Sequence, residues 1–126
     1  MSIRSILGLN PTHDTHADDI DDVISSIDNS RRRRVIDYLA NDPFATIGDL
    51  SEHIAVQEND VDDASQLCSD QRKRVYVGLY QTHLDRLDEL DVVDFEKARG
   101  TIERGDRFDT AERVLEAIRR EVAHGE

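Results

Sequence analysis

The residues best suited to recognising a polar partner lie in one stretch of the sequence, residues 69–90. A cationic cluster occupies residues 72–74, and Gln81 and Thr82 follow about two helical turns later. In duplex DNA an arginine can hold a guanine edge through two hydrogen bonds, a glutamine can hold an adenine edge in the same way, and threonine can bond either pair. These residue types therefore predict contact with base edges, provided that one element turns them to the same side.

A single helix over residues 69–90 is the element that the apolar spacing predicts. Its apolar positions are Tyr76, Leu79, Tyr80, Leu84, Leu87 and Leu90. On a helical wheel the apolar side centres on Tyr76, Tyr80, His83 and Leu87. The opposite side carries the predicted base-facing residues, which are Arg74, Gly78, Gln81 and Thr82. Gly78 has no side chain, so we expect the backbone to approach a partner closely there.

Charge favours only the first half of this helix as a surface for a polyanion. Residues 69–83 carry three cations against Asp70, whereas residues 84–96 carry Arg86 against six carboxylates. A helix that enters the major groove by its N-terminal end has this distribution.

Other cations can hold phosphates, which position a protein on DNA without specifying sequence. The candidates are Arg33, Arg34, Arg72, Lys73, Lys97 and Arg99. The first two belong to a run of four arginines in which Arg32 lies nearest the apolar stripe, with its stem along it. Pairing within the chain is the alternative, Arg33 with Asp37 and Arg31 with Asp28. The cluster at residues 72–74 can equally be a solvated helix face.

Capping residues and periodicity predict the remaining elements. They are helices at 18–27, at 31–40 and from Thr46 to about Ala55, a polar loop at 58–68, strands at 92–95 and 101–103 around a turn at 97–100, and a last helix capped by Asp109 with Glu112 in the capping-box position. The fold class is mostly α with a small β-hairpin. The predicted organisation is a tail at 1–17, a domain at 18–104 and a C-terminal helix at 105–126.

Amphipathic stripes at the two ends predict a homodimer, because an exposed apolar stripe needs a cover and a twin subunit can supply it. The candidate dimerisation residues are Ile20, Val23, Ile24, Ile27, Val114, Leu115, Ile118 and Val122.

Composition narrows the classes of function. The net charge is -12, and only two of the sixteen cations are lysines. This balance is typical of proteins adapted to high salt, with an ordinary acidic protein as the alternative, and it weighs against nucleic-acid binding in general. No phosphate-cradling glycine loop, nucleophile elbow or metal-ligand cluster is present, so we predict no enzyme, no cofactor and no metal. Cys68 is the single cysteine, and the sequence predicts a cytoplasmic protein without a signal peptide.

Three segments carry a resemblance to a known family. Residues 29–39 (NSRRRRVIDYL) and 46–55 (TIGDLSEHIA) resemble the first helices of archaeal winged-helix regulators. The run at 71–84 (QRKRVYVGLYQTHL), followed by LDELDVV at 87–93, resembles a haloarchaeal winged helix-turn-helix family of largely unassigned function, related in shape to the arsenic-repressor class. The resemblance implies a winged helix and DNA binding over about residues 18–104. The linker before residue 69 is about ten residues longer than a tight turn, and Asp91 stands where such sequences often have glycine.

Together these observations predict a homodimeric transcriptional regulator that reads double-stranded DNA with the helix starting near Ser69. The alternative is a winged-helix module for protein interaction or dimerisation that binds no DNA, a role that the net charge favours. A nucleic-acid mimic is a third possibility, and it requires an acidic patch free of the arginine runs.

Overall fold

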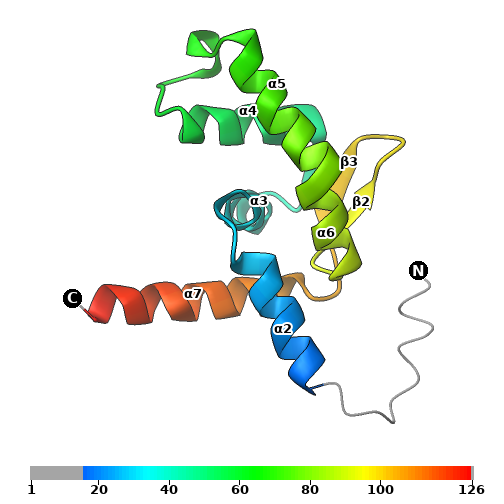
Figure 1. Ribbon diagram of the computed structural model, residues 1–126, viewed down its shortest axis with the longest axis vertical. Coiled ribbons are helices and arrows are strands. Elements are labelled where there is room, and N and C mark those ends of the chain that lie inside the picture. The colour runs from blue at the N-terminus through cyan, green and yellow to red at the C-terminus, as the bar shows by residue number, and fades with distance from the viewer. Residues whose placement is uncertain (1–15, 126) are drawn as a thin grey trace.

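The computed structural model describes residues 16–125, with side chains described from Asp19 onwards. Most of this chain is helical, and a small antiparallel sheet completes it (Figure 1). The elements are α2 (His16–Ile27), α3 (Ser30–Asn41), β1 (Phe44–Thr46), α4 (Ile47–Glu58), η1 (Ala64–Gln66), α5 (Ser69–Gly78), η2 (Leu79–His83), α6 (Leu84–Glu89), β2 (Val93–Glu96), β3 (Thr101–Arg104) and α7 (Phe108–His124). The predicted tail at 1–17 lies almost wholly outside the described residues, and α2 begins inside its last two positions. No described helix is long and apolar enough to cross a membrane.

The helix α3 lies at the centre of the molecule, between α4 and α5 on one side and α2 and α7 on the other (Figure 1). Asn29 caps its start, because its side-chain oxygen accepts hydrogen bonds from the amides of Arg31 and Arg32. The predicted inward residues of α3 and α4 are confirmed. They are Val35, Ile36 and Leu39 in α3, and Ile47, Leu50, Ile54 and Ala55 in α4.

The sheet has three antiparallel strands in the order β1-β3-β2. The predicted hairpin is confirmed, with β2 and β3 joined by a turn in which Gly100 has a φ of 67°. The sequence pattern does not predict β1, because three residues are too few for alternation to stand out. In β1 the buried Ala45 pairs with the buried Ile102 of β3, so the strand ties the start of α4 to the hairpin.

The predicted helix at 69–90 is one continuous helical run whose middle turn, η2, is a π-helix. The amide of Leu84 donates to the carbonyl of Leu79, five residues back. The buried side chains are therefore Val75, Leu79, Leu84, Leu87 and Leu90. The predicted apolar side is confirmed at Leu87, which is buried, and at Tyr80, which packs against the core. It is wrong at Tyr76, because a uniform wheel averages over the extra residue of the π-turn. Tyr76 is 40% exposed.

The helix α7 begins at Phe108, and the prediction that Asp109 caps it with Glu112 is wrong. Its N-cap is Arg107, which forms no side-chain capping bond, and Asp109 lies in the first turn. Tertiary contacts set the start instead, since the amide of Arg107 donates to the carbonyl of Asp91 at 2.8 Å and Phe108 is buried. Asp91 has a φ of 63° and takes the position after α6 that glycine usually occupies.

Two arginines fasten the outer helices to each other and to α3. Arg107 binds Asp19 and Asp22 of α2 at 2.6 and 3.2 Å. Arg119 of α7 binds Asp37 of α3 through both terminal nitrogens, at 2.8 and 3.0 Å. Each pair is partly exposed, so we expect these contacts to set the orientation of the helices more than to raise stability.

Gly105 provides a test of the junction between the hairpin and α7. A Cβ at this position would lie 2.4 Å from the carbonyl oxygen of Asp91, a backbone atom that cannot move cheaply. We expect Gly105→Ala to destabilise the protein by about 1–3 kcal/mol in chemical denaturation at constant salt. Gly48→Ala is the matched control, because nothing lies within 4 Å of a Cβ there. This variant is expected to be at least as stable as the wild type, and equal losses in both variants would contradict the account of the junction.

Candidate nucleic-acid interface

The outer face of α5 is exposed over most of its length. Lys73, Arg74 and Val77 lie at the surface, and Gln81 and Thr82 continue the exposed surface into η2. Buried Val75 and Leu79 hold the opposite side of this helical run against the core. Three of the four predicted base-facing residues are therefore accessible together on one helical run, and their contact with DNA stays a prediction.

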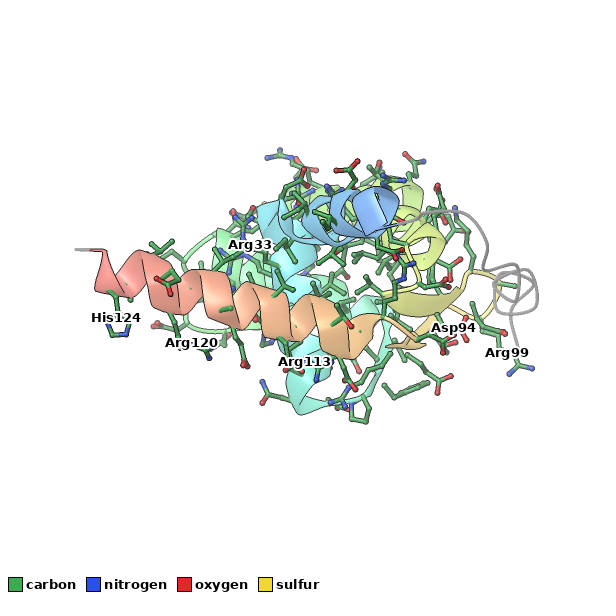
Figure 2. The ribbon with its side chains drawn as sticks, turned by 90° about the horizontal axis from the view of Figure 1, so that it is seen from below. Arg33, Asp94, Arg99, Arg113, Arg120 and His124 are labelled. Atoms are coloured by element: carbon green, nitrogen blue, oxygen red, sulfur yellow. The ribbon has the colours of Figure 1, made fainter. Side chains whose placement is uncertain are left out.

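Two cations of α5, Lys73 and Arg74, differ from most other cations in the described part of the chain because they have no partner there. Nearly every described cation forms a hydrogen bond or an ion pair, and the four that form none are Lys73, Arg74, Arg113 and Arg120. The first two are neighbours on α5. The other two lie on α7, where they point to the same side of the helix (Figure 2). The guanidinium of Arg74 and the ammonium of Lys73 are thus open to an anionic partner.

Arg72 has a different environment from its two neighbours. Its guanidinium donates to Glu52 of α4 at 2.5 Å and to the carbonyl of Ala64 in η1 at 2.6 Å. One side chain thereby connects α4, the η1 segment and α5. A phosphate contact at Arg72 would compete with these bonds, so we assign this residue to positioning α5.

Gly78 makes room for a side chain of its own chain. A Cβ at this position would lie 2.5 Å from a terminal nitrogen of Arg31. Arg31 is held there by two hydrogen bonds to Glu58, at 2.6 and 2.9 Å, and these bonds raise the pKa of the guanidinium above its ordinary range. This packing corrects the prediction that Gly78 leaves the backbone open to DNA.

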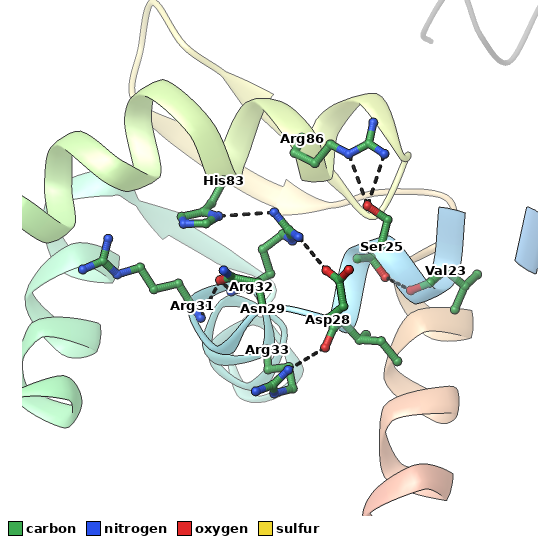
Figure 3. A network of polar contacts seen from close by, with 11 residues as sticks. Val23, Ser25, Asp28, Asn29, Arg31, Arg32, Arg33, His83 and Arg86 are labelled. Atoms are coloured by element: carbon green, nitrogen blue, oxygen red, sulfur yellow. Dashed lines mark hydrogen bonds and ion pairs between the residues drawn. The ribbon is translucent and has the colours of Figure 1, made fainter. Parts of the chain in front are cut away.

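Arg32 links the start of α3 to the π-turn. Its guanidinium donates to Asp28 at 2.7 Å and lies 3.4 Å from the Nδ1 atom of His83 (Figure 3). The side chain is only 13% exposed, as the prediction of a stem laid along the apolar stripe requires. Burial, reinforced by the charges of Arg32 and Arg31 and opposed by Glu58, lowers the pKa of His83 below its ordinary value. Because an arginine can only donate, a hydrogen bond between the two side chains requires an Nδ1 atom of His83 that carries no proton.

The predicted phosphate contacts of α3 are occupied within the chain. Arg33 donates to the carbonyl of Ile27 at 2.7 Å, and it leaves α3 on the side away from His83 (Figure 3). Arg34 donates to the side chain of Gln57 at 3.1 Å. Neither residue belongs to the exposed face of α5.

Arginines of this run do form ion pairs within the chain, as the alternative predicts, but the predicted partners are wrong. Asp28 pairs with Arg32 in place of Arg31, and Asp37 pairs with Arg119 of α7 in place of Arg33. Sequence spacing finds partners on the same helix, but the acids that these arginines reach mostly lie on other elements.

The hairpin turn contributes one open cation. Lys97 binds Asp85 at 2.8 Å and lies 4.6 Å from the centre of the Tyr80 ring, which fixes the hairpin to the helix behind it. Arg99 is 80% exposed, with only a loose 3.8 Å contact to Glu96, and it points away from the body of the protein (Figure 2). Both predicted hairpin residues are exposed, and Arg99 is the one whose charge is not held by a close ion pair.

The predicted dimerisation residues lie on α2 and α7, which pack against each other. Ile27 and Leu115 belong mainly to the core, with 6% and 3% of their surface exposed, so their assignment is corrected: they can form only the floor of a dimer surface. Val23 and Val114 are half-buried. The exposed members are Ile20, Ile24, Ile118 and Val122.

The shifted pKa of His83 predicts how stability depends on pH. Between about pH 6.5 and the lower pKa of the folded protein, the unfolded chain binds a proton that the folded chain excludes. Wild type should therefore lose stability relative to His83→Asn as the pH falls through this window, by at most about 1.4 kcal/mol per pH unit. Denaturation curves at constant potassium chloride measure the difference. His53→Asn, which removes an imidazole packed edge-on against Tyr38, is the control, and parallel curves for wild type and His83→Asn would contradict the assignment.

Comparison with known proteins assigns the chain to a family. No curated protein and no solved structure is similar enough to count as a match. A family model described as a domain of unknown function, DUF7344, matches residues 24–103, which run from the second half of α2 into β3 and leave α7 outside. The match covers more than half of the chain, so the protein belongs to the DUF7344 family.

Proposed function

We propose that this protein is a winged helix-turn-helix transcriptional regulator that acts in the cytoplasm as a homodimer and binds double-stranded DNA. In this assignment α4 and α5 form the helix-turn-helix pair, and α5 is the reading helix. The hairpin of β2 and β3 is the wing. Arg74, Gln81 and Thr82 face the bases, whereas Lys73 and Arg99 hold phosphates.

One observation carries the proposal. Lys73 and Arg74 are exposed, adjacent and without a partner among the described residues, although the chain has twelve more acids than cations. Such a chain can neutralise every cation internally, and it does so for most of them. Two cations left open beside Gln81 favour a surface whose anionic partner is another molecule.

The arrangement of the elements supports the same role. The helix α3, the helix α4 and the long helical run from α5 to α6 are followed by the hairpin of β2 and β3. The strand β1 pairs with β3 and leads directly into α4. This is the element order of a winged helix-turn-helix. Arg72 supports this arrangement by bonding α5 to α4 and to η1, so the helix pair stays in contact although residues 59–68 separate the two helices.

The salt concentration determines which contacts contribute most to the affinity for DNA. At molar salt the Debye length is about 3 Å, so the repulsion between DNA and the acidic surface is largely screened. The gain from releasing counterions also becomes small under these conditions. Binding then depends on hydrogen bonds to base edges, which directs the tests to Arg74 and Gln81.

The first test measures sequence preference. Duplexes selected from a random pool and scrambled versions of them are compared by fluorescence anisotropy from low to molar potassium chloride. We expect Arg74→Ala and Gln81→Ala each to reduce the preference for the selected duplex by about 1–3 kcal/mol, because each removes a side chain able to bond two atoms of one base. Unchanged preference in both variants would refute the placement of the reading surface.

A second test separates phosphate contact from base contact. Lys73→Ala should weaken selected and scrambled duplexes alike, and it should reduce the slope of log affinity against log salt by about one. Arg113→Ala is the matched control, since Arg113 is also exposed and has no partner among the described residues but lies on α7. An equal change of slope in both variants would mean that general charge is responsible rather than a site on α5.

A protein-interaction module on the same fold is the second candidate, favoured by the net charge and by the exposed apolar residues on α2 and α7. It predicts no binding to any duplex at any salt by a protein that circular dichroism shows to be folded.

A further inference from the structure

Apolar surface on this acidic protein gathers in one place. Of the seven large hydrophobic side chains exposed in the described chain, four lie on α2 and α7, and they are Ile20, Ile24, Ile118 and Val122. Ile24, Ile118 and Val122 surround a groove between the two helices, with Ile27 and Leu115 among its lining residues. The groove has a volume of about 680 Å³. An apolar surface of this kind favours a macromolecular partner.

The C-terminal end of α7 extends away from the rest of the molecule (Figure 1). Every residue from Ile118 to Gly125 is exposed, although the helix continues to His124. We call residues 118–125 the arm. Two turns of helix gain little stability from their own hydrogen bonds in water, and most helical stability in proteins comes from packing an apolar face. The arm presents such a face through Ile118 and Val122, which form one wall of the groove and are 41% and 62% exposed.

Charges beside the groove and on the arm are complementary. Arg33 lines the groove, and the only described hydrogen bond of its side chain is to the backbone carbonyl of Ile27. The acid one turn away from it, Asp37, is already taken by Arg119. On the arm, Glu121 lies beside Val122, is exposed, and forms no ion pair with any described residue. Each chain thus carries an arginine without a carboxylate at the groove and a carboxylate without a cation on the arm.

From this complementarity we infer that the arm of a second copy occupies the groove between α2 and α7, so that two copies exchange arms about a twofold axis. Val122 and Ile118 of one copy pack against Ile24 of the other, and Glu121 pairs with Arg33 across the interface. An amphipathic helix in an apolar groove is a common mode of recognition, and twofold symmetry satisfies both grooves at once. The inference rests on the proposed homodimer and names the surface and the ion pair that build it.

The first experiment removes the apolar contact. Sedimentation velocity and equilibrium of the full chain, in molar potassium chloride without DNA, should give a dimer for wild type and a monomer for Val122→Asp. We expect the dissociation constant to rise by about tenfold or more, because a carboxylate is costly to bury in an apolar groove. Val122 is 62% exposed, so the variant should fold, and circular dichroism checks this. Val77→Asp, which adds the same charge at an exposed valine on α5, is the matched control and should leave the dimer intact.

The second experiment tests the ion pair. Arg33→Glu and Glu121→Arg should each weaken the dimer, by about tenfold, because each places two like charges together. The double variant should recover most of the loss, and a mixture of the two single variants should form heterodimers more readily than either forms homodimers. The same exchange at Arg120 and Glu121 should not recover the dimer, since Arg120 does not line the groove.

Several results would overturn the inference. A wild type that is monomeric at all concentrations would overturn it. The groove would then be available to residues 1–15 of the same chain or to another ligand. A dimer that resists both Val122→Asp and the charge reversals would also do so, because its interface would lie elsewhere. Anisotropy with DNA is measured separately on the same variants. A dimer without DNA binding would refute the proposed regulator and leave the arm exchange standing. DNA binding by a monomer would refute the arm exchange and the proposed homodimer, and would leave the reading role of α5 standing.

Discussion

The arginine run at the start of α3 connects this helix to the segments around it, because each of its four side chains bonds a different residue. Arg31 binds Glu58 at the end of α4, and Arg32 bridges Asp28 to His83. The other two reach the last carbonyl of α2 and a glutamine of α4. A partly buried guanidinium needs such partners, since an unpaired charge away from water is costly. The same requirement explains why the densest cationic run in the sequence is not a free anion-binding surface, and why the open cations lie on α5, on α7 and at the hairpin turn.

The π-turn in the long helix has an equally direct effect on the candidate interface. One extra residue between Leu79 and Leu84 lets α5 bury Val75 while α6 buries Leu87, although no uniform stripe connects them. The turn lies against Arg32 through His83, and Gln81 and Thr82 are on its outer side. Such turns are frequent at functional sites because they turn side chains out of the regular pattern. The direction in which Gln81 points is therefore coupled to the packing of α3, which no local pattern encodes.

Local features of the sequence predict much of the fold, but they predict less of the candidate site. Caps at Asn29 and Thr46 and apolar spacing in α3 and α4 depend on neighbouring residues, so helix positions and the hairpin could be predicted. The strand β1, the start of α7 and the phase of the long helix depend on contacts between distant segments, and local pattern cannot supply them. At the site, Arg74 and Gln81 were identifiable from residue type. The roles of Gly78, Arg72 and Arg33 were not, because their partners Arg31, Glu52 and Ile27 come from other elements.

The two surfaces proposed to bind a partner, the exposed face of α5 and the groove, lie on different sides of the molecule. The helices α4 and α5 pack together on one side of α3, and α2 and α7 lie on the other side (Figure 1). The groove is lined mainly by α2 and α7, so it lies away from α5. A second copy seated in the groove therefore leaves Lys73 and Arg74 of both chains uncovered. Two such faces related by a twofold axis can meet successive turns of one DNA duplex, which is how dimeric helix-turn-helix proteins obtain affinity from a small reading surface. With only two open cations on each α5, an acidic chain needs this doubling more than a basic one does, so dimerisation and DNA binding are mutually dependent in the proposed mechanism.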